Sequence, residues 1–209
     1  MQQRWKQKSY VESGGEMIIV RPMRQEDKQQ VEDLVRGAMR KHYYCEPYEL
    51  PELMFAASRS DVVVGAIGIF LGGSERLPLE KSYALDYQSF PEVFERSKTV
   101  QIGRWVATAP NISEALLYIA IRHAYQNGYS WGIGEIKPKV LRYFARLGMR
   151  VVTLRGLAIV HNVPAAIRPY YLLPPQPIPC VIHLEDALAV LKEPINKLVI
   201  HGRVVMYDS

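Results

Sequence analysis

Short β-type runs alternate with helical segments along the second half of this 209-residue chain. Thr99–Ala107 precedes a helical segment at Glu114–Gln126, and Ser130–Ile136 precedes another, in which Pro138 occupies the first turn and Val140–Leu147 completes the helix. Consecutive parallel strands need a connection long enough to hold a helix, and such connections are right-handed. This order therefore predicts an α/β fold.

The first half of the chain predicts a strand, a helix and a β-hairpin. Met17–Arg21 is a short β-type run, and Gln25–Lys41 carries apolar residues at helical spacing. Leu53–Ser58 and Val62–Leu71 flank the tripeptide 59–61, which has the length of an antiparallel turn. Together, the two halves predict a mixed, twisted sheet with helices on both faces.

Five further segments have weaker signals. Ser89–Arg96 predicts a short helix, and Val151–Val160 predicts a strand. The Pro-rich stretch Pro169–Pro179 predicts an irregular connection, because proline interrupts both helices and strands. Leu184–Leu191 then predicts a short helix, and Lys197–Met206 predicts an edge strand. Either Val62–Leu71 or this last strand is a candidate for pairing across a homodimer.

Composition favours one globular domain. Hydrophobic residues make up 48% of the chain and charged residues 22%, and the length suffices for a sizeable core. Residues 1–15 are polar and end in Ser13-Gly14-Gly15, which predicts a flexible lead-in before a single domain over residues 16–209. The uncharged stretch Val62–Ser74 is too short to span a membrane, and no secretory signal precedes Met17. We therefore expect a cytoplasmic protein without a membrane span.

The formal net charge of +5 permits an anionic partner. No helix-turn-helix or zinc-finger pattern is present, so nucleic acid is not the expected partner. The cysteines, Cys45 and Cys180, have neither pair spacing nor metal-site spacing, and the five histidines show no metal spacing. We expect two small buried thiols and no bound metal.

Three sets of residues resemble known families. The segment 140–149, VLRYFARLGM, is similar to the late helix of the GNAT acyltransferase superfamily. Leu79–Asp86 followed by Val100–Trp105 resembles the central region of the thermostable hemolysin family, and 76–78, 90–92 and 103–106 resemble autoinducer (acyl-homoserine-lactone) synthases. The resemblance covers roughly residues 16–175 and implies an acyl-CoA N-acyltransferase (GNAT)-like fold that uses acyl-CoA or an acyl carrier protein as co-substrate.

The chain departs from these families at three places. Gln101 stands where they usually place a carboxylate, and residues 107–113 lack the Gly-rich loop that cradles the pyrophosphate of coenzyme A at a helix N-terminus. Aligned on Leu147-Gly148, the usual tyrosine of the late helix falls on Phe144, with Tyr143 one position earlier. The missing loop makes coenzyme A less favoured as the donor. The N-terminal half also lacks the Arg, Phe and Trp pattern of homoserine-lactone synthases, which disfavours an S-adenosylmethionine-using synthase.

The resemblance assigns the donor to the central strand, through Ile102, Gly103, Arg104 and Val106. In this fold the central strand commonly bulges and frees backbone N–H groups for the acyl group. Gly103 is the natural place for such a bulge, and its alternative role is that of a closely packed strand glycine. Arg104 is a candidate to pair with an acid or a phosphate.

Glu135 is the candidate general base. It lies at the end of a predicted strand, where the sheet of this fold separates, and a carboxylate beside an apolar cleft has a raised pKa. A solvated glutamate at a strand end is the alternative. Tyr143 is the candidate polar residue near the donor, while Glu46 and Glu49 lie on a Tyr-rich loop that could close over the acceptor.

The expected function is transfer of an acyl chain from a thioester to a small-molecule amine acceptor. Arg122, Arg142 and Arg146 could form a basic rim for phosphopantetheine or an acidic carrier protein, although solvated helix faces explain them equally well. The alternative function is a non-catalytic module that binds an acyl group or a nucleotide, which Gln101 and Phe144 favour. A membrane-active hemolysin would require a basic amphipathic helix, and the sequence does not single one out.

Overall fold

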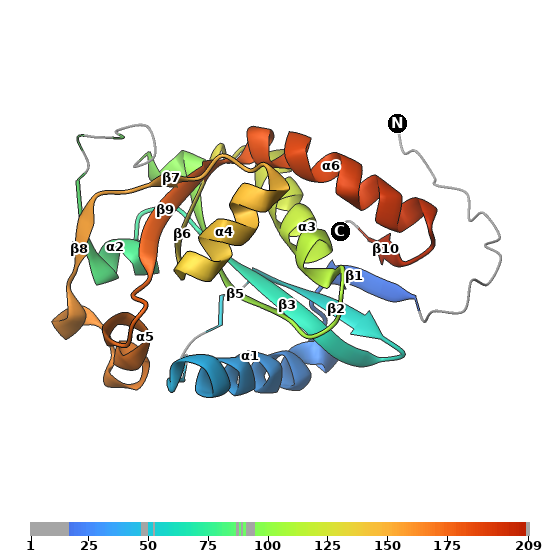
Figure 1. The fold of residues 1–209 in the computed structure, drawn as a ribbon, viewed down its shortest axis with the longest axis horizontal. Helices are drawn as coiled ribbons and strands as arrows, with labels where there is room; N and C mark the ends of the chain where they lie inside the picture. Colours follow the sequence, from blue (N-terminus) through green and yellow to red (C-terminus); the bar gives the residue numbers. More distant parts are fainter. Residues whose placement is uncertain are drawn as a thin grey trace.

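An eight-stranded mixed sheet forms the centre of the computed structural model, which describes residues 17–46, 50–51, 53–86, 88, 90 and 95–207. The strand order is β10-β1-β2-β3-β5-β6-β9-β7 (Figure 1). A separate pair, β4 and β8, lies beside it. The strands are β1 (Ile18–Pro22), β2 (Leu53–Arg59), β3 (Val62–Leu71), β4 (Tyr83–Leu85), β5 (Thr99–Ala107), β6 (Trp131–Ile136), β7 (Val152–Thr153), β8 (Gly156–Ala158), β9 (Ile178–His183) and β10 (Val204–Met206).

Helices cover both faces of the sheet, as predicted (Figure 1). One face carries α1, and the other carries α3 and α6, which pack against each other. The apolar side chains of α3 fill the larger core, while α1 seals a smaller one with Val31 and Val35. The helices are α1 (Lys28–Tyr43), α2 (Pro78–Ser82), α3 (Ile112–Gln126), α4 (Pro138–Leu147), α5 (Arg168–Leu172) and α6 (Leu184–Ile200).

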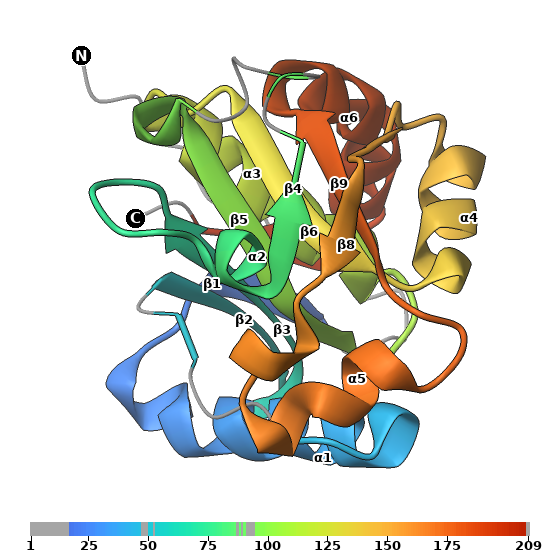
Figure 2. The same ribbon diagram turned by 90° about the vertical axis from the view of Figure 1, so that its left-hand side faces the viewer.

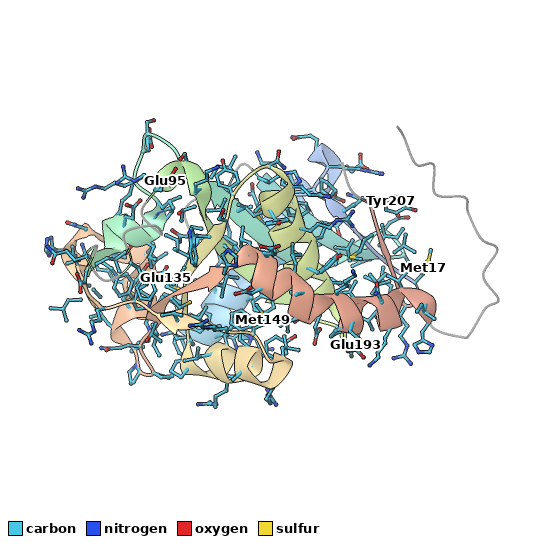
Figure 3. All side chains as sticks on the ribbon, turned by 90° about the horizontal axis from the view of Figure 1, so that it is seen from above. Met17, Glu95, Glu135, Met149, Glu193 and Tyr207 are labelled. Carbon is cyan, nitrogen blue, oxygen red and sulfur yellow. The ribbon has the colours of Figure 1, made fainter. Side chains whose placement is uncertain are left out.

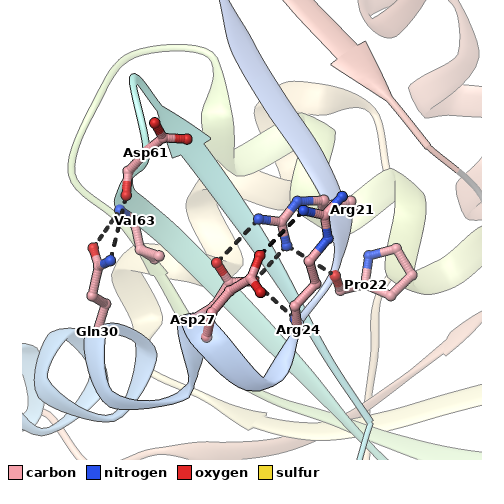
Figure 4. Close-up of polar contacts among 8 residues, drawn as sticks. Arg21, Pro22, Arg24, Asp27, Gln30, Asp61 and Val63 are labelled. Carbon is pink, nitrogen blue, oxygen red and sulfur yellow. Dashed lines mark hydrogen bonds and ion pairs between the residues drawn. The ribbon is translucent and has the colours of Figure 1, made fainter.

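The predicted hairpin is present as β2 and β3. Its two turn residues, Ser60 and Asp61, have φ values of 47° and 66°, as a turn that matches the twist of paired strands requires. Gln30 on α1 ties this turn to the helix, because its amide accepts the N–H of Val63 at 3.0 Å and donates to the carbonyl of Asp61 at 3.4 Å (Figure 4). The hairpin is therefore fixed both locally and by α1.

An ion pair between the half-buried Arg21 and the buried Asp27 joins β1 to the start of α1 (Figure 4). Two nitrogens of the Arg21 guanidinium donate to the two carboxylate oxygens of Asp27, and the backbone N–H of Arg24 donates to the same carboxylate at 2.8 Å. Burial opposes ionisation, but the hydrogen bonds from Arg21 and Arg24 hold the pKa of Asp27 below its usual value. The pair is therefore ionised at neutral pH.

We expect Asp27→Ala to lower the free energy of unfolding by about 1–3 kcal/mol, because it removes the hydrogen bonds of Arg21 and Arg24 to this carboxylate and leaves the half-buried Arg21 guanidinium without its partner. Asp33→Ala is the control, since Asp33 is an exposed residue of the same helix. We expect it to cost less than about 0.5 kcal/mol. Urea unfolding monitored by circular dichroism measures both, and equal effects would contradict the stabilising role of the pair.

The predicted strand Val151–Val160 is wrong as a single element. The chain forms β7 at one end of it and β8 at the other, and the two strands belong to different sheets. The position next to β6 is taken by β9, which pairs with it in antiparallel orientation from Trp131↔His183 to Ile136↔Ile178. Pro179 lies inside β9, and the neighbouring prolines led the sequence analysis to expect an irregular segment there.

The predicted edge strand Lys197–Met206 is also wrong in its first part. Residues up to Ile200 belong to α6, and only Val204–Met206 forms a strand, which pairs in parallel with β1. The helix continues because Leu191, Ile195 and Leu198 follow its core-facing stripe at helical spacing. Burial of this stripe outweighs the local alternation and the proline inside the helix.

Strand β3 lies between β2 and β5, so the prediction that it could pair across a dimer is wrong. The predicted lead-in 1–15 lies outside the described residues, as does most of the predicted helix Ser89–Arg96. No helix within the described part of the chain is both long and apolar enough to cross a membrane.

Candidate functional site

The two central strands β5 and β6 separate partway along their length. They pair in parallel at Thr99↔Trp131, Val100↔Gly132 and Gln101↔Ile133, and the register ends there. Beyond this point β5 remains paired with β3, and β6 remains paired with β9. The sheet therefore opens between the later residues of the two strands, and backbone groups on the facing edges have no strand partner there.

A β-bulge in β5 lies at this opening. Gly103 pairs with Gly68 and Val106 pairs with Ala66, so two residues of β5 oppose one residue of β3. The positive φ of 55° falls on Arg104, one residue after the predicted position at Gly103. A Cβ atom at Gly103 would meet only one side-chain atom of Phe70, at 3.8 Å, so packing does not require glycine there.

The opening holds a cavity of about 150 Å³. Residues 101–106 of β5 and 132–137 at β6 form its walls, so the four predicted donor residues, Ile102, Gly103, Arg104 and Val106, all line it. The cover comes from the ends of α1 and α5, whose residues Tyr43 and Tyr170 have ring centroids 5.0 Å apart. Figure 2 shows α5 beside α1.

Glu135 is one of the residues that line this cavity, and Figure 3 labels it. Its Oε1 accepts the hydroxyl of Tyr171 at 2.7 Å, and its backbone carbonyl accepts the hydroxyl of Tyr170 at 3.1 Å. Its Oε2 is buried and has no hydrogen-bond partner within the described ranges. Burial raises the pKa of Glu135, while the Tyr171 hydrogen bond and the cations Arg104 and Lys137 act in the opposite direction.

This raised pKa predicts a pH-dependent cost to stability. In the unfolded chain the Glu135 pKa is about 4.3, so its contribution to stability is fully present below that pH and is lost as pH rises through the higher folded pKa. Glu135→Gln removes the titrating group. We expect the unfolding free energy of the variant minus that of the wild type to increase with pH above 4, by about 1.4 kcal/mol per unit of pKa shift. Urea unfolding from pH 4 to 8 measures it, and a flat or falling difference would contradict the assignment.

Lys137 holds the cover in place from inside the protein. Its Nζ donates to the backbone carbonyls of Tyr170, Leu173 and Pro175, and the contact to Pro175 is 2.8 Å. The ammonium also lies 4.5 Å from the ring centroid of Tyr170. Burial lowers the pKa of Lys137, and the Glu135 carboxylate opposes that shift. Lys137 thus ties the segment that carries Tyr171 to the wall of the cavity.

The structure does not bring Tyr143 into the cavity. Phe144 lines the wall and stacks on Trp105, with ring centroids 5.6 Å apart. Tyr143 lies on the neighbouring side of α4, where burial and the Glu114 carboxylate raise its pKa. The position at which related helices carry a tyrosine therefore presents a phenyl ring without a proton to donate.

Three other candidate residues have structural contacts. The side-chain oxygen of Gln101 accepts the backbone N–H of Leu79 at 2.7 Å, which fixes the start of α2. Cys180 lines the cavity, but burial raises its pKa to about 12, so it is a neutral thiol. Glu46 forms an exposed ion pair with Arg40, and Glu49 lies outside the described residues.

Sequence reasoning did not find Tyr170, Tyr171 and Lys137 as site residues. The available signal was the adjacent tyrosine pair inside a Pro-rich stretch. That stretch was read only as Pro-rich, and neither tyrosine lies near Glu135 along the chain. Only the folded structure brings α5 onto the opening between β5 and β6.

The sequence matches a known family, and the structure is similar to solved structures. A family model described as thermostable hemolysin matches residues 22–168. The structure of FeeM, an N-acyl amino acid synthase from uncultured soil microbes, superposes with a TM-score of 0.60 at 14% identity, covering 83% of this chain and 94% of that one. A search of curated proteins finds no match.

Two acyl-homoserine-lactone synthases have similar structures. The CoA-dependent synthase BjaI, with MTA, superposes with a TM-score of 0.60 at 13% identity and covers 93% of this chain and 95% of its own. LasI superposes with a TM-score of 0.56 at 14% identity and covers 93% of this chain and 100% of its own. The predicted GNAT-like acyltransferase fold is confirmed.

Proposed function

The chain belongs to the thermostable hemolysin family, and from this membership and its acyltransferase fold we propose that it transfers an acyl group from a thioester donor to a small amine acceptor. The observation that carries the proposal is the buried carboxylate of Glu135 in the opening between β5 and β6. Such a carboxylate has the raised pKa that suits a general base.

The parted strands suit an extended, amide-containing donor arm. Backbone groups on the facing edges of β5 and β6 lack a strand partner beyond Gln101 and Ile133, so an extended chain can hydrogen-bond to them as an added strand would. The bulge at Arg104 turns backbone groups out of the ladder with β3. N–H groups freed in this way can donate to the acyl carbonyl, whose oxygen gains negative charge as the amine attacks.

Glu135 and its surroundings suit the acceptor amine. The unpartnered Oε2 can accept the proton that the amine loses when it attacks the thioester carbon. Tyr43 and Tyr170 line the cavity, and apolar ring surface there leaves fewer polar partners for water. Exclusion of water favours transfer to the amine over hydrolysis of the thioester.

The exposed charge on helix α4 favours an acyl carrier protein, over coenzyme A, as the thioester donor. Val140 and Phe144 on one side of this helix line the cavity. Its outer side and the residues just after it carry four exposed cations, none of which has an ion pair to another described residue: Lys139, Arg142, Arg146 and Arg150. A cationic stripe beside the cavity complements an acidic carrier protein.

Two observations favour the second candidate function, a module that binds an acyl thioester without turning it over. Gln101 is occupied as a hydrogen-bond acceptor for the start of α2, and Phe144 cannot donate a proton. The cavity and its apolar walls can bind an acyl group whether or not Glu135 acts as a base. Binding without release of free thiol would identify this function.

The structure also revises one expectation about membranes. Helix α4 is a basic amphipathic helix, contrary to the sequence analysis, but Phe144 is buried and Val140 and Leu147 pack against the core. An interfacial helix needs a free apolar face to enter a membrane. We therefore propose no membrane activity for α4, and dye-loaded liposomes are expected to stay intact.

The test of the proposed function is a thiol-release assay. The full chain is incubated with acetyl, octanoyl or dodecanoyl thioesters of coenzyme A or of an acyl carrier protein, together with a panel of amino acids and other small amines. Free thiol that appears together with the matching amide in mass spectrometry is the expected result. Thermal stabilisation without thiol release across the panel would favour the binding module, and the absence of both would overturn the proposal.

A further inference from the structure

The Tyr171 hydroxyl lies between Glu135 and Ser82. It is 2.7 Å from Oε1 of Glu135 and 3.2 Å from Oγ of Ser82. Ser82 directs its own proton to the carbonyl of Pro78, at 2.9 Å, so toward Tyr171 it can only accept. A single phenolic proton therefore serves two acceptors, a carboxylate and a hydroxyl.

When Glu135 is ionised, the Tyr171 hydroxyl donates its hydrogen bond to the carboxylate and not to Ser82. Hydrogen bonds to a carboxylate are shorter and stronger than those to a neutral hydroxyl, and the two distances agree with that order. Tyr171 is 4% exposed and Ser82 7%, so water does not compete for this proton. Oε1 of Glu135 therefore accepts the hydrogen bond from Tyr171, and Oε2 is the oxygen left to accept a proton.

We propose that Tyr171 is the positioning residue of the general base: it fixes Oε1 of Glu135 and leaves Oε2 as the oxygen that meets the acceptor amine. The inference rests on the proposed acyl transfer. In that reaction the amine nitrogen bonds to the acyl carbon, and Oε2 takes the proton from the nitrogen. The C–S bond of the thioester then breaks, and the leaving sulfur takes the proton back to form the free thiol.

Other groups around Glu135 do not replace this contact. The charged and titratable groups that face Glu135 are Arg104 on β5, Lys137 before α4, Tyr83 on β4, Tyr170 and Tyr171 on α5, and Cys180 on β9. Arg104 and Lys137 favour the ionised carboxylate through charge alone. Among the described side chains, Tyr171 supplies the hydrogen bond to the carboxylate itself.

The test needs no substrate. In protein labelled with carbon-13 at glutamate carboxyl groups, the Glu135 resonance is the one that Glu135→Gln removes, and its titration gives the pKa directly. We expect Tyr171→Phe, which keeps the ring, to raise that pKa by about one to two pH units, the equivalent of one lost hydrogen bond to a charge. We expect the acid limb of kcat/KM, measured with octanoyl-carrier protein, to move by the same amount.

Tyr83→Phe is the matched control. Tyr83 is also buried in this aromatic cluster, but its hydroxyl donates to the carbonyl of Pro177, at 3.1 Å. We expect removal of the Tyr83 hydroxyl to leave the pKa of Glu135 unchanged. Ser82→Ala provides a second variant of opposite sign, because without the competing acceptor the phenolic proton stays with Glu135 and the pKa falls.

The outcomes separate the inference from the proposed function. An unchanged Glu135 titration in Tyr171→Phe, or the same shift in Tyr83→Phe, would overturn the positioning role. If Tyr171→Phe does not fold, a rise in the Glu135 pKa in Ser82→Ala would overturn it instead. A shifted titration in a protein that turns over none of the thioesters would support the hold of Tyr171 on Glu135 and reject the proposed acyl transfer.

Discussion

Glu135→Gln is expected to lower kcat/KM for acyl transfer by about 10²- to 10⁴-fold, the usual contribution of a positioned general base. Glutamine keeps the size of the side chain and can still accept the Tyr171 hydroxyl, but its amide cannot take a proton from the amine. Thiol release at saturating acceptor measures the effect. The apparent Kd for the donor, from thermal shifts, should change little because the proposed contacts of the donor arm are with the strand edges.

The control for this variant is Glu185→Gln, an exposed glutamate in the first turn of α6. It should have wild-type kinetics within about twofold. Glu135→Gln would contradict the assignment if it kept full turnover, or if it lost turnover and donor binding together. The first result would place the base elsewhere, and the second would indicate a collapsed cavity.

Reversal of charge on α4 is expected to have the second large effect. The double variant Arg142→Glu, Arg146→Glu should lower kcat/KM for octanoyl-carrier protein by about 10- to 100-fold, since like charges then face an acidic partner. The same variant should retain wild-type rates with octanoyl-pantetheine, which lacks both phosphate and protein. Steady-state thiol release with each donor measures the contrast.

The loss should shrink as salt rises toward 1 M, because exposed charges are then screened. Lys192→Glu, Lys197→Glu makes the same change in net charge on α6 and should affect neither donor. An equal fall in kcat/KM for both donors in the α4 variant would show that these arginines stabilise the helix and do not bind the carrier protein. Equal losses in the α4 and α6 variants would point to net charge alone.

Local patterns were sufficient to predict five strands of the central sheet, β1, β2, β3, β5 and β6, but not β9. The hairpin of β2 and β3 follows from β-branched runs around a short polar turn, and β5-α3-β6 follows from alternating strand and helix periods. These elements also locate the opening, because Glu135 lies near the end of a strand that the sequence defines well. For this reason, the sequence could single out Glu135 and residues of β5 that line the cavity.

Features that depend on contacts between distant parts of the chain could not be predicted from the sequence. Strand β9 forms within a Pro-rich region because β6 and β7 pair with its two edges, which no local pattern shows. The positive φ of Arg104 depends on the register between β3 and β5. Tyr171 reaches Glu135 from a segment distant along the chain, which Lys137 ties to the cavity wall.

Hydrogen exchange with a stable donor analogue tests the central claim most directly. The full chain is compared with and without octanoyl-pantetheine in which a thioether replaces the thioester, so that the analogue binds and does not react. We predict slower exchange of the backbone amides of residues 102–106 and 134–136, on the facing edges of β5 and β6. Unchanged exchange at both edges, with protection elsewhere or with none, would contradict the claim that the thioester binds between these strands.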